Sequence, residues 1–129
     1  YLDVGHNPHA AKELAKTLSG LPKATRQVAV FGMLSDKDRA QVCRIMVSSF
    51  NKWYLSDLQG PRGGIAQDLC AMLSEAGVPQ EKIQTFKTVE EALQRAIEEA
   101  HETDRIVTFG SFLTVASAIE YLKEKVGRN

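Results

Sequence analysis

The stretch Val28-Ala29-Val30-Phe31-Gly32 decides the fold class, and Ile106-Val107-Thr108-Phe109-Gly110 repeats its pattern near the other end of the chain. Both stretches are nearly continuous in apolar or β-branched residues. Buried parallel strands have this composition, because helices cover both faces of the sheet and neither face meets water. Three further apolar runs complete the predicted strands: Leu2–Val4, Trp53–Leu55 and Ile83–Phe86.

Amphipathic stretches with helix start signals lie between these runs. Asn7-Pro8 supplies an N-cap followed by proline at the first helical position, and Thr88-Val89-Glu90-Glu91 reads as a capping box. Ser35 or Asp36 is expected to open the second helix, and Ser111 can cap the last. The buried face of the third helix is predicted from Ile65, Leu69, Met72, Leu73 and Ala76, and that of the last from Ala116, Ile119 and Leu122.

The alternation of strands and helices predicts one α/β domain. We expect a Rossmann-like, three-layer architecture with a mostly parallel sheet of about five strands, flanked by helices and joined by right-handed crossovers. The length of 129 residues and the hydrophobic content of 43% suit a single globular core.

Charge and cysteine content exclude several classes of protein. Sixteen Lys and Arg balance sixteen Asp and Glu, so the basic excess of a nucleic-acid-binding module is missing and neither nucleic acid nor an anionic membrane is expected as a partner. Cys43 and Cys70 stand apart among apolar residues and are expected to be buried, reduced thiols. A secretory signal or a spanning segment is not found, so the cytoplasm is the expected compartment.

Polar residues and glycines gather in the loops that follow the predicted strands. In an open parallel sheet, ligands bind outside the carboxyl ends of the strands, where these loops meet. Turns are polar in most proteins, so this asymmetry favours a site without defining one. The loops are residues 5–9, 34–38, 56–64, 87–88 and 110–112.

Four of these loops together carry a family resemblance. They read Leu2-Asp3-Val4-Gly5-His6-Asn7-Pro8-His9-Ala10, Gly32-Met33-Leu34-Ser35-Asp36-Lys37-Asp38, Gly60-Pro61-Arg62-Gly63 and Gly110-Ser111-Phe112-Leu113-Thr114-Val115-Ala116. In this order they resemble the carboxy-terminal domain of folylpolyglutamate and dihydrofolate synthases, within the Mur ligase family, over nearly the whole chain. The D-x-x-H-N-P-H stretch is the most specific element. The chain departs from the family pattern at Gly5, Gln59 and Leu113, where Ala, an acidic residue and His are frequent, and Gln59 replaces one polar contact of the family.

The resemblance implies an ATP-dependent amide ligase. Such enzymes join L-glutamate to dihydropteroate, or to the γ-carboxyl of (tetrahydro)folate polyglutamates, through an acyl phosphate, with ATP and Mg²⁺ as cofactors. Residues 1–129 would be the carboxy-terminal domain, closing over an active site shared with an amino-terminal ATPase domain. The phosphate-binding motif G-x-x-x-x-G-K-[ST] is absent from this sequence. We therefore expect the phosphate-binding loop to lie upstream in a longer chain, of which these residues are a fragment that is inactive alone. The whole enzyme is expected to be a monomer.

The resemblance assigns the nucleotide side of the cleft to Asp3, His6 and Asn7. Asp3 ends the first predicted strand, where a carboxylate can accept hydrogen bonds from ribose hydroxyls; its alternative role is to cap the turn that follows. His6 either contacts the nucleotide or bonds its own loop, and Asn7 is explained as the N-cap, which can coexist with an anion at the helix terminus. A metal site of His6, His9 and His101 is not expected, because His101 falls at the far edge.

The substrate side of the cleft falls to Lys37, Arg62, Ser111 and Phe112 by the same resemblance. Lys37 works against the helix dipole at its position, which is mild evidence for a ligand; the stronger alternative is a solvated surface lysine. The Arg62 guanidinium has the fork geometry that pairs with a carboxylate, so it is a candidate to hold the incoming glutamate; its alternative is a salt bridge that stiffens the loop. Ser111 and Phe112 would touch substrate, or serve as a cap and a core aromatic.

Two other functions stay open at this point. The chain could belong to another Mur-type ligase that acts on a muropeptide or a cyanophycin-type chain. It could also be a non-catalytic, flavodoxin-like or receiver-like binding module, although only Asp3 and Asp57 approach the acidic pattern of a receiver.

Overall fold

Four parallel strands form one sheet in the order β3-β2-β1-β4 within the residues that the computed structural model describes, 1–5 and 7–127. The strands are β1 (Gln27–Phe31), β2 (Lys52–Ser56), β3 (Ile83–Phe86) and β4 (Arg105–Phe109). The helices are α1 (Pro8–Ser19), α2 (Arg39–Met46), α3 (Ala66–Glu75), α4 (Val89–Glu99) and α5 (Phe112–Gly127), with short 3-10 turns at Val47–Ser49 and Gln80–Lys82. The predicted α/β class and the parallel sheet are confirmed.

The first predicted strand is only a bridge. Leu2 pairs in parallel with Thr108, and three backbone hydrogen bonds tie the segment to β4: Asp3 N–H to Thr108 O at 3.0 Å, Thr108 N–H to Tyr1 O at 2.8 Å and Gly110 N–H to Val4 O at 2.7 Å. The segment lies alongside β4 but is too short for a regular ladder. The sheet therefore has four strands rather than the predicted five.

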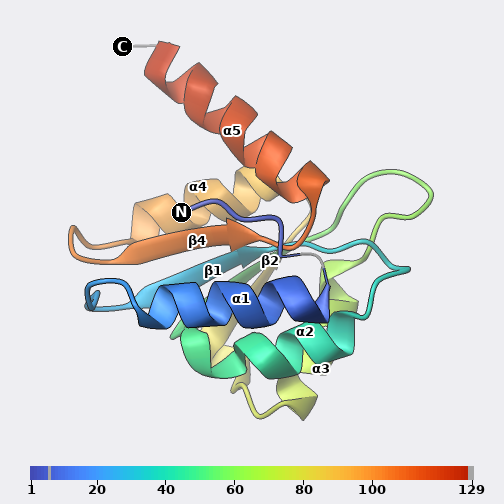
Figure 1. The fold of residues 1–129 in the computed structure, drawn as a ribbon. Coiled ribbons are helices and arrows are strands. Elements are labelled where there is room, and N and C mark those ends of the chain that lie inside the picture. Colours follow the sequence, from blue (N-terminus) through green and yellow to red (C-terminus); the bar gives the residue numbers. More distant parts are fainter. Residues whose placement is uncertain (6, 128–129) are drawn as a thin grey trace.

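Helices cover both faces of the sheet, which gives the predicted three layers. In Figure 1, α1, α2 and α3 lie on one side of the strands, and α4 and α5 lie on the other. Alternate residues of β1 point to the two layers: Ala29 and Phe31 join the core under the first three helices, and Val28 and Val30 join the core under α4 and α5. This period of two in a strand buried on both faces explains the continuous apolar runs.

Caps set the starts of three helices. The Asn7 side chain accepts a hydrogen bond from Ala10 N–H, and the Thr88 hydroxyl accepts one from Glu91 N–H, as predicted. The prediction for the second helix was wrong, because its N-cap is Asp38 and not Ser35 or Asp36. Residues 35–37 form a turn first, closed by the 3.2 Å hydrogen bond from Lys37 N–H to Leu34 O.

Two predicted faces need correction. Ile65 precedes α3 and is 55% exposed, so it lies outside the buried stripe of that helix. In α5, Ile119 and Leu122 are each 38% exposed, and Ala116 is exposed too, whereas Thr114 and Ala118 are fully buried. Figure 1 gives the reason: α5 starts against the sheet and then rises away from it, so its fully buried residues lie in its first half, and Tyr121 packs on the core as a partly buried residue.

Both cysteines are buried and free, as predicted. Burial raises the pKa of Cys43 to about 12, which keeps the thiol protonated near neutral pH. Trp53 and Tyr54 lie within β2 and are buried, also as predicted. None of the helices that the structure describes is both long enough and apolar enough to cross a membrane.

We call the side of the sheet where the strands end the carboxyl edge and the side where they begin the amino edge. The loops after β1 and β2 extend from the same side of the sheet, together with the start of α5 (Figure 1). The sequence motifs are thus gathered at the carboxyl edge.

Candidate functional site

The first loop of the chain meets the last one at the carboxyl edge. The hydrogen bond from Gly110 N–H to Val4 O places residues 3–5 beside the start of α5. Gly5 is buried, and a Cβ placed there would lie 3.3 Å from the ring of Phe109. Residues at opposite ends of the sequence therefore share one surface, as the family resemblance requires.

Asp3 and Asn7 both hold the backbone of this first loop. The Asp3 carboxylate accepts a 3.0 Å hydrogen bond from Gly5 N–H, which is the turn-capping role. Asn7 Oδ1 accepts a 2.8 Å bond from Ala10 N–H. These contacts use one of the two oxygens of Asp3 and the single oxygen of Asn7. The second Asp3 oxygen and the Asn7 amide NH2 group are compatible with a nucleotide contact, which stays a prediction. His6 lies outside the described residues.

Ser111 and Thr114 join the last loop to β1. Ser111 is 3% exposed, and its hydroxyl accepts a hydrogen bond from Thr114 N–H at 3.0 Å. Thr114 Oγ1 lies 3.0 Å from Ser111 Oγ and donates to Gly32 O at 2.8 Å. Ser111 is therefore the cap of α5, and contact with substrate stays a prediction. Phe112 is the first residue of α5, and the prediction for its side chain lies outside what is described.

Gly110 allows the two loops to approach. Its φ is +121°, and a Cβ at this position would lie 2.1 Å from Gly32 O and 2.9 Å from Phe31 Cδ1. A side chain is excluded both by the backbone conformation and by the contact. The backbones just after β1 and β4 are therefore in contact. Along the chain, the sheet grows from β1 to β2 and β3 on one side, and then β4 is added on the other side of β1.

The loop after β1 is joined to the loop after β2. Ser35 N–H and Ser35 Oγ both donate to Arg62 O, at 2.9 and 3.2 Å. Gly64 is buried, and a Cβ there would lie 2.0 Å from Met33 O, so these backbones touch as well. Four loops thus contact one another in turn, through residues 3–5 and 7–8, 110–111, 32–38 and 58–64, and we call this edge the surface of the four loops.

Arg62 and Lys37 carry the positive charge of this surface. The Arg62 guanidinium makes a 2.6 Å ion pair with Asp36, and the two side chains are 59% and 48% exposed. Lys37 lies in the turn before the Asp38 cap and has no ion-pair partner in the described part of the chain. The salt-bridge alternative for Arg62 is therefore observed, and binding of substrate stays a prediction.

Arg39 lies beneath the same loops. Its side chain is 12% exposed, and its Nη1 atom is buried without a hydrogen-bond partner among the described residues, 3.7 Å from Asp68 Oδ2. A Cβ on Gly64 would lie 3.2 Å from this nitrogen. Sequence reasoning missed Arg39 and Asp36. The position of the two loops after neighbouring strands was the signal that could have paired Asp36 with Arg62.

A hollow of about 410 Å³ lies at the carboxyl ends of β2 and β3. Asp57, Ile65, Gln67, Lys87 and Glu91 line it, and none of the predicted site residues does. Asp57 Oδ1 accepts a 2.6 Å hydrogen bond from Ala66 N–H, which anchors the start of α3. This hollow is therefore separate from the predicted nucleotide-binding and substrate-binding residues.

The surface of the four loops carries the positive charges of Lys37 and Arg62 beside the carboxylates of Asp3, Asp36 and Asp38. Within residues 1–5 and 7–127, no group of three or more His, Cys, Asp or Glu side chains is placed to hold a metal ion. The arrangement suits the binding and orientation of an anionic ligand at the carboxyl edge.

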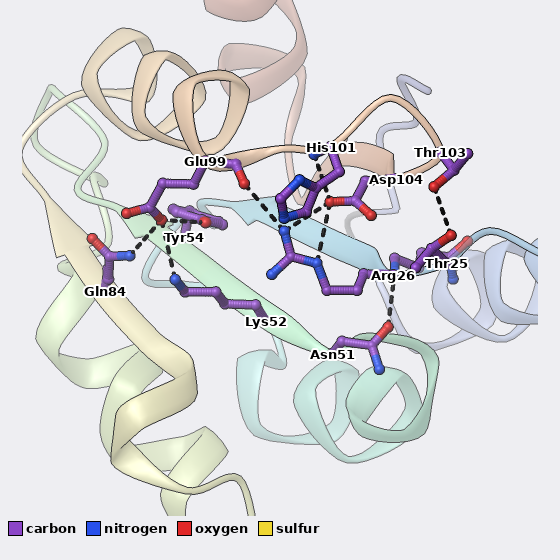
Figure 2. A network of polar contacts seen from close by, with 11 residues as sticks. Thr25, Arg26, Asn51, Lys52, Tyr54, Gln84, Glu99, His101, Thr103 and Asp104 are labelled. Carbon is purple, nitrogen blue, oxygen red and sulfur yellow. Dashed lines mark hydrogen bonds and ion pairs between the residues drawn. The ribbon is translucent and has the colours of Figure 1, made fainter.

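The amino edge holds a second polar cluster, shown in Figure 2. Glu99 Oε1, at the end of α4, accepts hydrogen bonds from Tyr54 at 2.6 Å and from Lys52 and Gln84 at 3.0 Å each. The bond from Tyr54, with those from Lys52 and Gln84, lowers the pKa of Glu99 to about 2. Burial, and then the same bond to Glu99, raise the pKa of Tyr54 well above its ordinary value.

Arg26 and Asp104 complete this cluster. Arg26 donates to Asp104 Oδ2 from Nε at 3.1 Å and from Nη2 at 2.8 Å, and also to the backbone carbonyl of Glu99 at 3.1 Å. These bonds from Arg26, with one from His101 N–H, lower the pKa of Asp104. The cluster joins the end of α4 to the starts of β1, β2 and β4, far from the predicted site; His101 lies here, as expected.

Comparison with family models gives a match over residues 1–112. The matching model is that of the Mur ligase family, glutamate ligase domain. The dihydrofolate synthase/folylpolyglutamate synthase of Escherichia coli K12 is 38% identical over 120 residues, which is 93% of this chain and 27% of that protein.

Solved structures give the same relationship. Escherichia coli FolC in complex with ADP aligns with a TM-score of 0.88 at 37% identity, over 97% of this chain and 29% of that one. A bifunctional folylpolyglutamate synthase/dihydrofolate synthase with Mn, AMPPNP and L-glutamate bound aligns with a TM-score of 0.81 at 37% identity, over 95% of this chain and 29% of that one. The chain therefore spans less than a third of the length of these relatives.

Proposed function

Because this chain belongs to the Mur ligase family, as its glutamate ligase domain, we propose that it is the carboxy-terminal domain of an ATP-dependent folate–glutamate ligase. The proposed reaction joins L-glutamate to dihydropteroate or to the γ-carboxyl of a (tetrahydro)folate polyglutamate. The observation that carries the proposal is the surface of four loops. The segments that resemble the folate branch in sequence are the ones that the fold brings together at the carboxyl edge.

ATP supplies the phosphoryl group that converts the substrate carboxylate into an acyl phosphate, which the glutamate amine then attacks. For this chain we propose the roles of binding and orientation. Asp3 and Asn7, with His6, would face the nucleotide. The second carboxylate oxygen of Asp3, which does not bond Gly5, is the group that can accept a hydrogen bond from a ribose hydroxyl. In the first turn of α1, the backbone N–H of His9 is the donor that suits an anion, because Pro8 has no N–H and those of Ala10 and Ala11 donate to Asn7.

Arg62 is the proposed anchor of the incoming glutamate. Its guanidinium lies on a loop whose backbone is fixed by Ser35 and by contact with Met33. An arginine held at its base but exposed at its tip can pair with a carboxylate through two parallel N–H donors. Lys37, on the adjoining loop, would add positive charge, and Ser111 and Phe112 would border the substrate from the other side.

The described residues do not fit a magnesium cage, since they offer no suitable group of acidic or histidine ligands. We therefore propose that Mg²⁺ is held by the amino-terminal ATPase domain of the full-length protein, together with the ATP phosphates. The further proposals are that this domain is the main partner, that the enzyme is a cytoplasmic monomer and that the fragment alone is inactive. Because the chain belongs to this family, we no longer propose the alternative of a free-standing, flavodoxin-like binding module.

The test uses the full-length ligase with two variants that separate the two sides of the cleft. Asp3→Ala should raise the KM for ATP more than the KM for glutamate. Arg62→Ala should weaken the use of glutamate about thirtyfold or more, because truncation of a partly desolvated charge pair costs about 2–5 kcal/mol. Arg62→Lys should not restore it, since an ammonium lacks the fork.

The measurement is steady-state kinetics with glutamate or ATP varied and the other substrates saturating. If Arg62→Ala leaves glutamate kinetics unchanged while the melting temperature falls, Arg62 is a structural residue. If Asp3→Ala affects glutamate alone, the nucleotide side is misassigned.

A further inference from the structure

Asp36 occupies the position that a substrate carboxylate would take on Arg62. Its Oδ2 atom lies 2.6 Å from Arg62 Nη2, the distance of a charge-assisted hydrogen bond. The two residues come from loops after neighbouring strands, so the contact forms across the proposed binding surface and not within one loop.

The backbones under this ion pair are held in place. Arg62 O accepts two hydrogen bonds from Ser35, which adjoins Asp36 in sequence. Leu58 N–H donates to Gly64 O at 2.9 Å, and Gly64 lies against Met33 O, so the loop after β2 closes on itself and on the loop after β1. Separation of Asp36 from Arg62 therefore requires only side-chain rotation.

The ion pair itself is weak and exchangeable. Both side chains are about half exposed, and exposed ion pairs are stabilised little because water solvates the separated charges. Rotation of Arg62 away from Asp36 leaves both groups in contact with solvent. Lys37 lies next to Asp36 in the same turn and has no ion-pair partner in the described residues, so a positive charge stays near the released carboxylate.

On these observations we propose that Asp36 is an internal competitor for the substrate carboxylate. It pairs with Arg62 in the free enzyme and is displaced when the incoming amino acid binds. The inference rests on the proposed role of Arg62. It adds a residue that lowers the affinity for the substrate: Asp36 competes for the Arg62 guanidinium, which weakens binding of the substrate carboxylate and favours its release.

The experiment measures the KM for glutamate in the full-length ligase carrying Asp36→Asn, an isosteric change that removes the competing charge. The KM should fall about 1.5- to 5-fold, the range that corresponds to the loss of one exposed ion pair, with kcat unchanged. Asp38→Asn is the matched control. It removes the same charge two residues away, at a carboxylate that caps α2 and does not touch Arg62, and asparagine is also a good N-cap.

The combination with Arg62→Ala separates the possible outcomes. If Asp36 acts through Arg62, Asp36→Asn has no effect on the glutamate KM in the Arg62→Ala background. A rise in KM for Asp36→Asn would show that Asp36 orients Arg62 instead, and an equal fall in Asp38→Asn would show a general charge effect; either result overturns the proposal. If Arg62→Ala alone leaves the KM unchanged, the proposed glutamate pocket itself fails.

Discussion

Different kinds of contact hold the loops together at the carboxyl edge and at the amino edge of the sheet. At the carboxyl edge, backbones touch at Gly64 and Gly110, and the charged pair of Asp36 and Arg62 is exposed. At the amino edge, side chains make the contacts. The hydroxyl of buried Tyr54 and two nitrogens converge on one oxygen of Glu99 (Figure 2).

This difference predicts opposite responses to mutation. The carboxyl edge should be sensitive to added atoms, because there is no room between its backbones, and insensitive to the loss of its exposed side chains. The amino edge should be sensitive to the loss of side-chain groups. A division of this kind leaves the charged groups of the carboxyl edge available for ligands while the other edge supplies stability.

The largest effect is expected from Gly110→Ala. The change places a methyl group 2.1 Å from Gly32 O in a residue with a φ of +121°. Backbone strain and overpacking together should lower the free energy of unfolding by about 2–5 kcal/mol. Urea denaturation followed by circular dichroism measures this. A variant within about 0.5 kcal/mol of the parent would disprove the close approach of the two loops.

Glu99→Gln should lower the free energy of unfolding by about 2 kcal/mol at pH 7. This is less than the full pKa shift would give, because about one third of the Glu99 side chain is exposed and water screens its interactions. Folding lowers the pKa of Glu99 from 4.5 to about 2, so its contribution is complete above pH 4.5 and is lost as the pH falls toward 2. Denaturation curves of both proteins between pH 7 and 2 should therefore converge at low pH. Glu98→Gln, at an exposed neighbour, is the control, and a difference that is independent of pH would contradict the prediction.

Tyr54→Phe should cost about 1 kcal/mol, because it removes one charge-assisted hydrogen bond while Lys52 and Gln84 still serve Glu99. The change also removes the strongest cause of the low Glu99 pKa, so that pKa should rise. Denaturant titration gives the first quantity, and carboxyl NMR titration gives the second. An unchanged Glu99 pKa would mean that the tyrosine is not part of the cluster in solution.

The smallest effect is expected from Arg62→Ala. The isolated chain should lose less than about 0.5 kcal/mol, because only an exposed ion pair is removed and the backbone carbonyl of Arg62 keeps its bonds to Ser35. A thermal melt compares the variant with the parent. A loss as large as that of Glu99→Gln would remove the contrast between the two edges.

Sequence patterns predicted the fold well where one local signal was sufficient. The runs around Val30 and Val107 indicated buried parallel strands, and Asn7 and Thr88 marked helix starts correctly. Ser35 and Asp36 misled the prediction because both residue types favour N-caps and turns alike, and here they serve a turn. Ile119 and Leu122 were placed in the core because periodicity shows that a face is apolar and not what covers it.

The candidate site was predictable in composition but not in its pairings. Four motifs located the loops, and the rule for open parallel sheets located the edge. The contacts between these loops could not be predicted, because the pairing of Asp36 with Arg62 and of Thr114 with Gly32 depends on which strands are neighbours in the sheet. The Glu99 cluster was missed for the same reason, since its members are ordinary surface residue types distributed over three elements.

The position of β1 at the centre of the sheet has a consequence for synthesis of the chain. Gln27 bonds Asn51, 24 residues away, on one side, and Arg105, 78 residues away, on the other. At roughly 5–20 residues per second, the ribosome needs about 4–16 s to make the residues between β1 and β4. Throughout that interval the apolar strand Val28–Phe31 can be paired along one edge at most. Its open edge is a strand-pairing surface that the nascent protein must keep from other chains until Arg105–Phe109 emerges.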